Sequence, residues 1–186
     1  MQKTGRALGL EGEGHVERTL VLVKPDGVRR GLSCEVLARL ERSGMKLIGL
    51  KMVTIDREFA ERHYTWEDIG ARHGDEIRSQ LLDYITEDPV VAAVFEAVSA
   101  VANARKLCGS TEPASAAPGT IRGDYCHETY SFANDAGKAV HNLLHASATL
   151  AEAKEELSLW FEEGELQRYR RSDEAEHLLD KRSEPN

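Results

Sequence analysis

The stretch Arg18-Thr19-Leu20-Val21-Leu22-Val23 is a short run of apolar and β-branched residues. Such a run is typical of a strand buried in a sheet. The segment from Ser33 to Ser43 follows, with apolar residues that recur on one helical face, and Gly44 stands where that helix should end. The chain therefore opens with a strand followed by a helix.

Later segments repeat this pattern of strands and helices. We expect strands over 45–55, 89–95 and 140–146, and helices over 57–64, 75–85, 98–107 and 149–160. Asp56 is a candidate N-cap, 109–119 reads as a loop, and Thr149 with Glu152 forms a candidate capping box. Without the helical pair 57–85, the order is strand, helix, strand, strand, helix, strand. This order predicts an α+β, ferredoxin-like βαββαβ fold, a four-stranded antiparallel sheet covered by helices.

The 186 residues, 41% hydrophobic and 30% charged, suit one folded domain. Glycines and scattered charges predict a flexible N-terminal tail over 1–16, and charged residues dominate a C-terminal tail over 166–186. The net charge of −8 opposes binding to nucleic acid or to anionic membranes. No secretion signal or membrane span is recognisable. The three cysteines read as reduced, buried thiols, so we expect a cytoplasmic protein.

His145 ends an apolar run just before a helix start signal. A histidine can accept a phosphoryl group on one ring nitrogen when a carboxylate fixes the tautomer through the other nitrogen. Glu156, eleven residues later, is the candidate carboxylate. Most histidines are surface or core residues, so this hypothesis depends on the remaining residues.

Three cations and one hydroxyl could hold phosphates. Lys24 follows the first strand, Arg105 lies near a predicted helix end, Thr111 lies in the loop, and Arg122 follows Pro118-Gly119-Thr120-Ile121. Guanidinium groups bind phosphate oxygens bidentately and remain charged. The alternative reading is a solvated lysine at a proline turn and two arginines in surface salt bridges.

Two further polar residues lie close to these in the sequence. Tyr64 closes a predicted helix, where its hydroxyl could reach the phosphate or the histidine, although tyrosine is usually a packing residue. Asn142, three residues before His145, would point to the opposite face of a regular strand, so we expect a bend between them.

The chain from Arg18 to Phe161, about 145 of 186 residues, resembles nucleoside diphosphate kinases. The resemblance rests on separated motifs: Glu17-Arg18-Thr19-Leu20 leading to Lys24-Pro25-Asp26-Gly27, Pro89-Val90-Val91-Ala92, Pro118 to Asp124, Asn142 to Ser147, and Glu156-Leu157-Ser158-Leu159-Trp160-Phe161.

The resemblance implies a ping-pong kinase that passes the γ-phosphate of a nucleoside triphosphate, such as ATP, to a diphosphate, such as GDP. In this reading His145 becomes phosphorylated, Glu156 orients it, and Tyr64 and Ser147 support the site. The nucleotide would be bound by Lys24, Arg105, Thr111, Arg122 and Asn142. Magnesium (Mg2+) would arrive with the nucleotide, and the protein would be a homo-oligomer, a hexamer or tetramer.

Three departures from the family pattern stand out. The segment 64–84 is longer and carries Ile77 where many members have base-stacking phenylalanines. The segment 125–140 is also longer, and we expect an added hairpin there. Ala148 replaces a common acidic residue, which implies rearranged contacts to metal-bound water.

Two other functions compete with the kinase. A catalytically silent nucleotide-binding regulatory module would keep the same scaffold, but the intact site residues argue against it. Nucleic-acid binding would need a basic stripe, which the sequence lacks.

Overall fold

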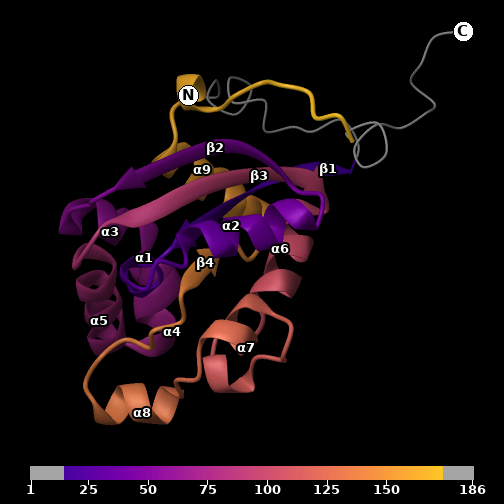
Figure 1. Cartoon of the computed structure of the whole chain (residues 1–186). Coiled ribbons are helices and arrows are strands. Elements are labelled where there is room, and N and C mark those ends of the chain that lie inside the picture. The colour runs from indigo at the N-terminus through magenta and orange to yellow at the C-terminus, as the bar shows by residue number, and fades with distance from the viewer. Residues whose placement is uncertain (1–14, 174–186) are drawn as a thin grey trace, which may run out of the picture.

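The computed structural model describes residues 15–173, which form a four-stranded sheet covered by helices (Figure 1). The strands are β1 (Val16–Val23), β2 (Lys46–Val53), β3 (Val90–Val98) and β4 (Leu144–Ala146). The α-helices are α1 (Pro25–Arg29), α2 (Ser33–Arg42), α3 (Arg57–His63), α4 (Ala71–His73), α5 (Asp75–Thr86), α6 (Ala100–Cys108), α7 (Ile121–Tyr125), α8 (Tyr130–Asp135) and α9 (Leu150–Trp160). Single turns of other helix types are η1 (Trp66–Gly70), η2 (Pro113–Ser115) and η3 (Glu163–Glu165).

The strands lie in the order β2-β3-β1-β4, and each neighbouring pair is antiparallel. The predicted α+β, ferredoxin-like fold is confirmed. The long central pair runs from Val16 opposite Val98 to Val23 opposite Val91. The short edge strand β4 pairs with the end of β1 and places His145 opposite Leu22.

Both faces of the sheet are buried. Because strand side chains alternate between faces, Val21 and Val23 pack with α2 and α6, whereas Leu20 and Leu22 pack with α3, α5 and α9. This burial explains why β1 is apolar over consecutive positions rather than at alternate ones.

The last strand is shorter than expected because the backbone turns at Leu143. Its φ is 70°, in the left-handed region, and Leu144 N donates to Asn142 O at 2.8 Å. The prediction of a strand over 140–143 is therefore wrong, whereas the bend expected between Asn142 and His145 is confirmed.

Three segments form helix where the sequence suggested otherwise. The expected hairpin in 125–140 is wrong, because α8 forms there with Thr129 accepting a hydrogen bond from Phe132 N at 3.1 Å. The residues read as a proline turn begin α1, with Pro25 at the first helical position. The segment before α5 adds η1 and α4.

The beginning of the expected C-terminal tail contacts β2. Leu166 packs on the core, and Gln167 N donates to Ile48 O at 2.7 Å. The expectations for 1–14 and 174–186 concern residues outside the described part. Within 15–173, no helix is long and apolar enough to cross a bilayer.

The cysteines are free thiols, as expected. Cys108 is buried and Cys126 is half-buried, but Cys34 is exposed, so the expectation of burial is wrong for Cys34.

Candidate active site

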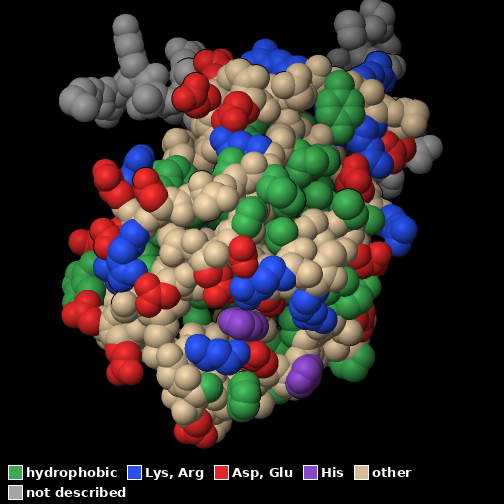
Figure 2. All heavy atoms as spheres, turned by 60° about the vertical axis from the view of Figure 1, so that its left-hand side comes forward, with side chains coloured by type: hydrophobic (Ala, Val, Ile, Leu, Met, Phe, Trp, Pro, Cys, Tyr) green, Lys and Arg blue, Asp and Glu red, His purple; other side chains and the backbone are tan. Residues whose placement is uncertain are grey.

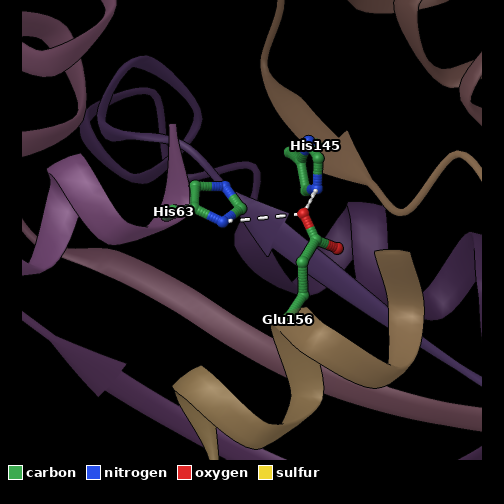
Figure 3. A group of neighbouring side chains, drawn as sticks. All are labelled: His63, His145 and Glu156. Carbon is green, nitrogen blue, oxygen red and sulfur yellow. Dashed lines mark hydrogen bonds and ion pairs between the residues drawn. The ribbon is translucent and has the colours of Figure 1, made fainter. Parts of the chain in front are cut away.

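His145, Glu156 and Ser147 form a hydrogen-bonded chain between β4 and α9 (Figure 3 shows the first two). His145 Nε2 lies 2.6 Å from Glu156 Oε1. Ser147 Oγ donates to Glu156 Oε2 at 2.6 Å and accepts from Leu20 N at 3.3 Å. Because the carboxylate engages Nε2, the imidazole has its Nδ1 available for a reacting phosphorus atom.

The start of α9 fixes the position of Glu156 two helical turns later. Thr149 accepts a hydrogen bond from Glu152 N at 3.1 Å, as the predicted N-cap requires. The predicted capping box is wrong in its second hydrogen bond. The Glu152 carboxylate accepts from Ala148 N at 2.9 Å instead of from the N–H of the N-cap residue Thr149. Both bonds tie the helix to the loop that follows His145.

Glu156 is buried but remains ionised. Burial alone would raise its pKa, but electrostatic attraction to the adjacent His145 and the hydrogen bonds from His145 and Ser147 hold the pKa below its usual value. An ionised carboxylate can fix the imidazole tautomer and stabilise positive charge on the ring.

His63 is a component of the site to which the sequence assigned no role. Its Nδ1 lies 3.5 Å from Glu156 Oε1, and its ring packs edge-on against His145 with centroids 4.8 Å apart (Figure 3). Trp160 Nε1 donates to His63 Nδ1 at 3.3 Å. Burial, and then electrostatic interaction with the neighbouring His145, lowers the pKa of His63 to about 3, so this imidazole is neutral. In the sequence, only the position of His63 directly before the candidate residue Tyr64 could have indicated that it belongs to the site.

The same three side chains are the one group of histidines and acids in the described region close enough to share a metal ion, with ligand atoms within 4.8 Å. The 2.6 Å separation between His145 and Glu156 is a hydrogen-bond distance and leaves no space for an ion between them. The geometry therefore favours an acid–base pair.

Lys24 lies on the other side of the site and is almost completely buried. Its Nζ donates to Asn142 Oδ1 at 2.9 Å and lies 5.4 Å from the centre of the Tyr84 ring. Burial and the nearby Arg122 charge lower its pKa to about 7. This lysine is therefore not the solvated side chain of the alternative reading.

Arg122 is buried, so the surface salt bridge considered as an alternative is wrong for it. Its guanidinium donates to four backbone carbonyls, those of Asn142, Gly109, Ser110 and Leu144. Burial lowers its pKa below the ordinary arginine value. Arg122 thereby holds the loop that begins at Gly109 and the start of β4 together while it adds positive charge.

Arg105 and Thr111 lie at the outer side of this cluster. Arg105 Nη1 donates to Ala146 O at 3.4 Å, and Thr111 O accepts from Asn142 Nδ2 at 3.0 Å. Both residues are exposed, so the Arg105 guanidinium and the Thr111 hydroxyl can reach a ligand. On the face drawn in Figure 2, lysine and arginine side chains border a histidine in a hollow of the surface.

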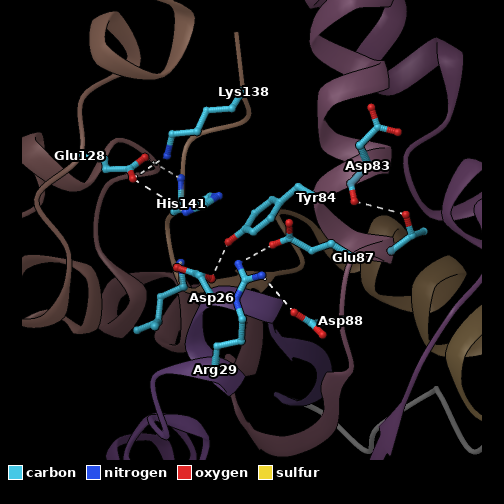
Figure 4. A network of polar contacts seen from close by, with 11 residues as sticks. Asp26, Arg29, Asp83, Tyr84, Glu87, Asp88, Glu128, Lys138 and His141 are labelled. Carbon is cyan, nitrogen blue, oxygen red and sulfur yellow. Dashed lines mark hydrogen bonds and ion pairs between the residues drawn. The ribbon is translucent and has the colours of Figure 1, made fainter. Parts of the chain in front are cut away.

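Asp26 is a second residue that the sequence did not identify, because its Pro-Asp-Gly context reads as a turn. It is buried, accepts from Leu143 N at 3.2 Å, and accepts from the Tyr84 hydroxyl (Figure 4). Asp26 therefore stabilises the bend that precedes β4.

Tyr64 lines a cavity of about 460 Å³ with His63, His145 and Glu156. Its buried hydroxyl has no hydrogen-bond partner among the described residues. Burial, and then the charge on Glu156, raises the pKa of the phenol. A buried hydroxyl without a partner is available to a ligand.

Residues 17–166 match the family model described as nucleoside diphosphate kinase. The chain belongs to the nucleoside diphosphate kinase family. The nucleoside diphosphate kinase of Borreliella burgdorferi is 43% identical over 162 residues, 87% of this chain and 97% of the relative. That of Archaeoglobus fulgidus is 47% identical over 86% of this chain and 95% of the relative.

Solved kinase structures agree with this assignment. The Borrelia burgdorferi enzyme, crystallised as a transition-state mimic with vanadate and ADP, has a TM-score of 0.86 at 43% identity, covering 88% of this chain and 97% of that one. The Halobacterium salinarum enzyme in complex with CDP has a TM-score of 0.73 at 40% identity, covering 87% and 97%. This protein is an enzyme, a nucleoside diphosphate kinase acting on nucleoside di- and triphosphates.

Proposed function

We propose that this kinase transfers phosphate in two steps through a phosphohistidine at His145. In the first step the Nδ1 lone pair attacks the γ-phosphorus of a nucleoside triphosphate, the bond to the β–γ bridging oxygen breaks, and the diphosphate leaves. In the second step a terminal oxygen of another diphosphate attacks the phosphohistidine, and the nitrogen–phosphorus bond breaks. The 2.6 Å contact between His145 Nε2 and Glu156 carries this proposal, because it orients Nδ1 for attack.

The other site residues position and neutralise the phosphates. Arg105, Arg122 and the Thr111 hydroxyl would hold the distal phosphates, and Lys24 and Asn142 would contact the ribose. Tyr64 would donate its unpartnered hydroxyl to the transferring phosphate, and Ser147 would hold Glu156. Phosphoryl transfer is catalysed mainly by positioning and charge stabilisation, which suits such a set.

Magnesium would enter as part of the nucleotide substrate. The groups around the proposed phosphate positions are mainly cationic or hydroxyl groups, and the Glu156 carboxylate is engaged by His145 and Ser147. They fit a polyphosphate better than a resident ion, because Mg2+ prefers oxygen ligands and phosphates supply them. Bound magnesium would neutralise phosphate charge.

The family resemblance supports three broader proposals: a kinase domain over 17–165 between flanking segments 1–16 and 166–186, a homo-oligomer of four or six chains, and a cytoplasmic location. Sedimentation equilibrium of the full chain tests the second. A monomer or dimer at micromolar concentration would contradict it.

The first experiment is incubation of the protein with γ-labelled ATP and magnesium. We expect acid-labile, base-stable label in the wild type that added GDP or CDP discharges. His145→Ala should take no label, while His73→Ala, a change of the exposed histidine on α4, should label normally. Nucleotide binding without label in the wild type would instead indicate the silent regulatory module.

A further inference from the structure

The inserted segment between α7 and β4 begins and ends at the proposed nucleotide site. It starts after Tyr125, three residues beyond Arg122, and returns to the site at Asn142. The short helix α8 lies in its middle (Figure 1). The proposed mechanism uses no residue of 126–141.

Two hydrogen bonds fasten the start of the segment to the loop that carries Thr111. Tyr130 N donates to Glu112 Oε1 at 2.9 Å, and Ala114 N donates to Glu128 O at 3.1 Å. The first residue of α8 is therefore held beside the loop that carries Thr111.

The end of the segment is fastened as firmly. The Glu128 carboxylate accepts from His141 N at 3.0 Å and from Lys138 Nζ at 2.7 Å, and the His141 ring stacks on Tyr84 with centroids 4.8 Å apart (Figure 4). With both ends held, α8 has a defined place beside the site.

The Tyr130 side chain reaches toward the phosphate-binding residues. Its hydroxyl lies close to the Thr111 side chain and near the Arg122 charge, while 43% of the residue remains exposed. A phenol donates one O–H and can bond a phosphate oxygen. The burial of part of the ring raises its pKa, which keeps that proton in place.

We infer that the Tyr130 hydroxyl, supplied by the inserted helix α8, is a further ligand of the nucleotide's distal phosphates, beside Thr111. This inference rests on the proposed placement of the phosphates at Arg105, Thr111 and Arg122. It gives the longer segment a function: it delivers one neutral donor to a site otherwise built mainly from cations.

The test compares Tyr130→Phe with wild type in steady-state exchange between ATP and a diphosphate. We expect KM for both nucleotides to rise about tenfold, because losing one hydrogen bond to a charged acceptor weakens binding by about that factor. The kcat of the variant should stay within about twofold of the wild-type value. Phe132→Leu, a change of the exposed ring on the same helix, is the matched control and should leave KM unchanged. A Tyr130→Phe KM equal to that of wild type overturns the inference.

Two inhibitors identify the part of the nucleotide that Tyr130 contacts. Inhibition by inorganic tripolyphosphate should weaken about tenfold in Tyr130→Phe, while inhibition by adenosine should not change. The reverse pattern would place Tyr130 at the base and overturn the phosphate assignment.

The same loss of tripolyphosphate affinity should persist in a Thr111→Val background. If Tyr130→Phe no longer weakens tripolyphosphate binding in the Thr111→Val background, Tyr130 only positions Thr111, and the inference is overturned. Direct titration with tripolyphosphate gives these answers even if wild type forms no phosphohistidine, so failure of the proposed function is detected separately.

Discussion

His145 Nε2 lies 2.6 Å from Glu156 Oε1, and the same carboxylate accepts a hydrogen bond from Ser147 through its second oxygen. One buried anion thus fixes the ring of the proposed nucleophile and is itself fixed from the other side. In the proposed mechanism, α9 therefore sets the direction of attack through Glu156.

Replacing Glu156 with glutamine should lower kcat/KM roughly 10-fold or more. An ionised acceptor strengthens a hydrogen bond by about 1–2 kcal/mol over a neutral one, and the charge that stabilises the ring is also lost. Steady-state exchange assays measure the effect. Glu163→Gln, at an exposed position outside the cavity, is the control, and an unimpaired Glu156→Gln enzyme would refute the orienting role.

Binding of ADP at pH 8.5 should take up a fraction of a proton. Lys24 has a pKa of about 7 in the free enzyme and is mostly neutral at this pH, whereas a nearby phosphate favours its charged form. Calorimetric titrations in HEPES and Tris, which differ in ionisation enthalpy, report the uptake. Lys24→Met should bind with less uptake, and equal enthalpies in both buffers for wild type would contradict the prediction.

Lys24→Met should be more stable than wild type, and most clearly so below pH 7. Because the pKa of Lys24 is lower in the folded chain, the unfolded chain binds more protons between about pH 7 and 10.5, and the penalty of burying the charge declines over that range. We expect a gain of roughly 2–4 kcal/mol at pH 6.5 that shrinks by pH 9.5.

Denaturant unfolding at the two pH values, at one protein concentration, measures this gain. Lys154→Met changes an exposed lysine of α9 and should show no such trend. A Lys24→Met gain that grows with pH would contradict the argument.

Substitution by lysine should affect protein stability differently at the two site arginines. Arg122→Lys leaves several buried carbonyls without donors and should lower the free energy of unfolding by about 3–5 kcal/mol. Arg105→Lys, at an exposed position, should change stability by less than about 1 kcal/mol. It should nevertheless lower kcat/KM roughly 100-fold through loss of a phosphate donor. Thermal unfolding and kinetics on the same preparations separate the effects, and equal stability losses would disprove the distinction.

The sequence predicted the sheet well because its strands are apolar and its helices amphipathic. The run from Leu20 to Val23 and the N-cap at Thr149 depend on local residue types, which periodicity and capping rules detect. The α8 helix escaped prediction because it has only six residues and its first residue is held by Glu112, which is distant in sequence.

Within the site, the residues that the sequence did not identify depend on tertiary contacts. His63 and Asp26 acquire their importance from burial against Glu156 and Leu143, which no neighbouring residue reveals. The buried state of Lys24 and Arg122 was likewise invisible, since the same residue types usually stand in solvent.

The left-handed backbone of Leu143 has a consequence for how this chain tolerates change in length. Asp26 and Lys24 hold the Leu143 backbone by its N–H and carbonyl, so β4 takes its register from that point and not from the preceding segment. Residues can then be added or removed before Asn142 without displacing the imidazole. The position of the His145 ring is thus independent of the length of the segment before Asn142, and α8 fits there without a change in the register of β4.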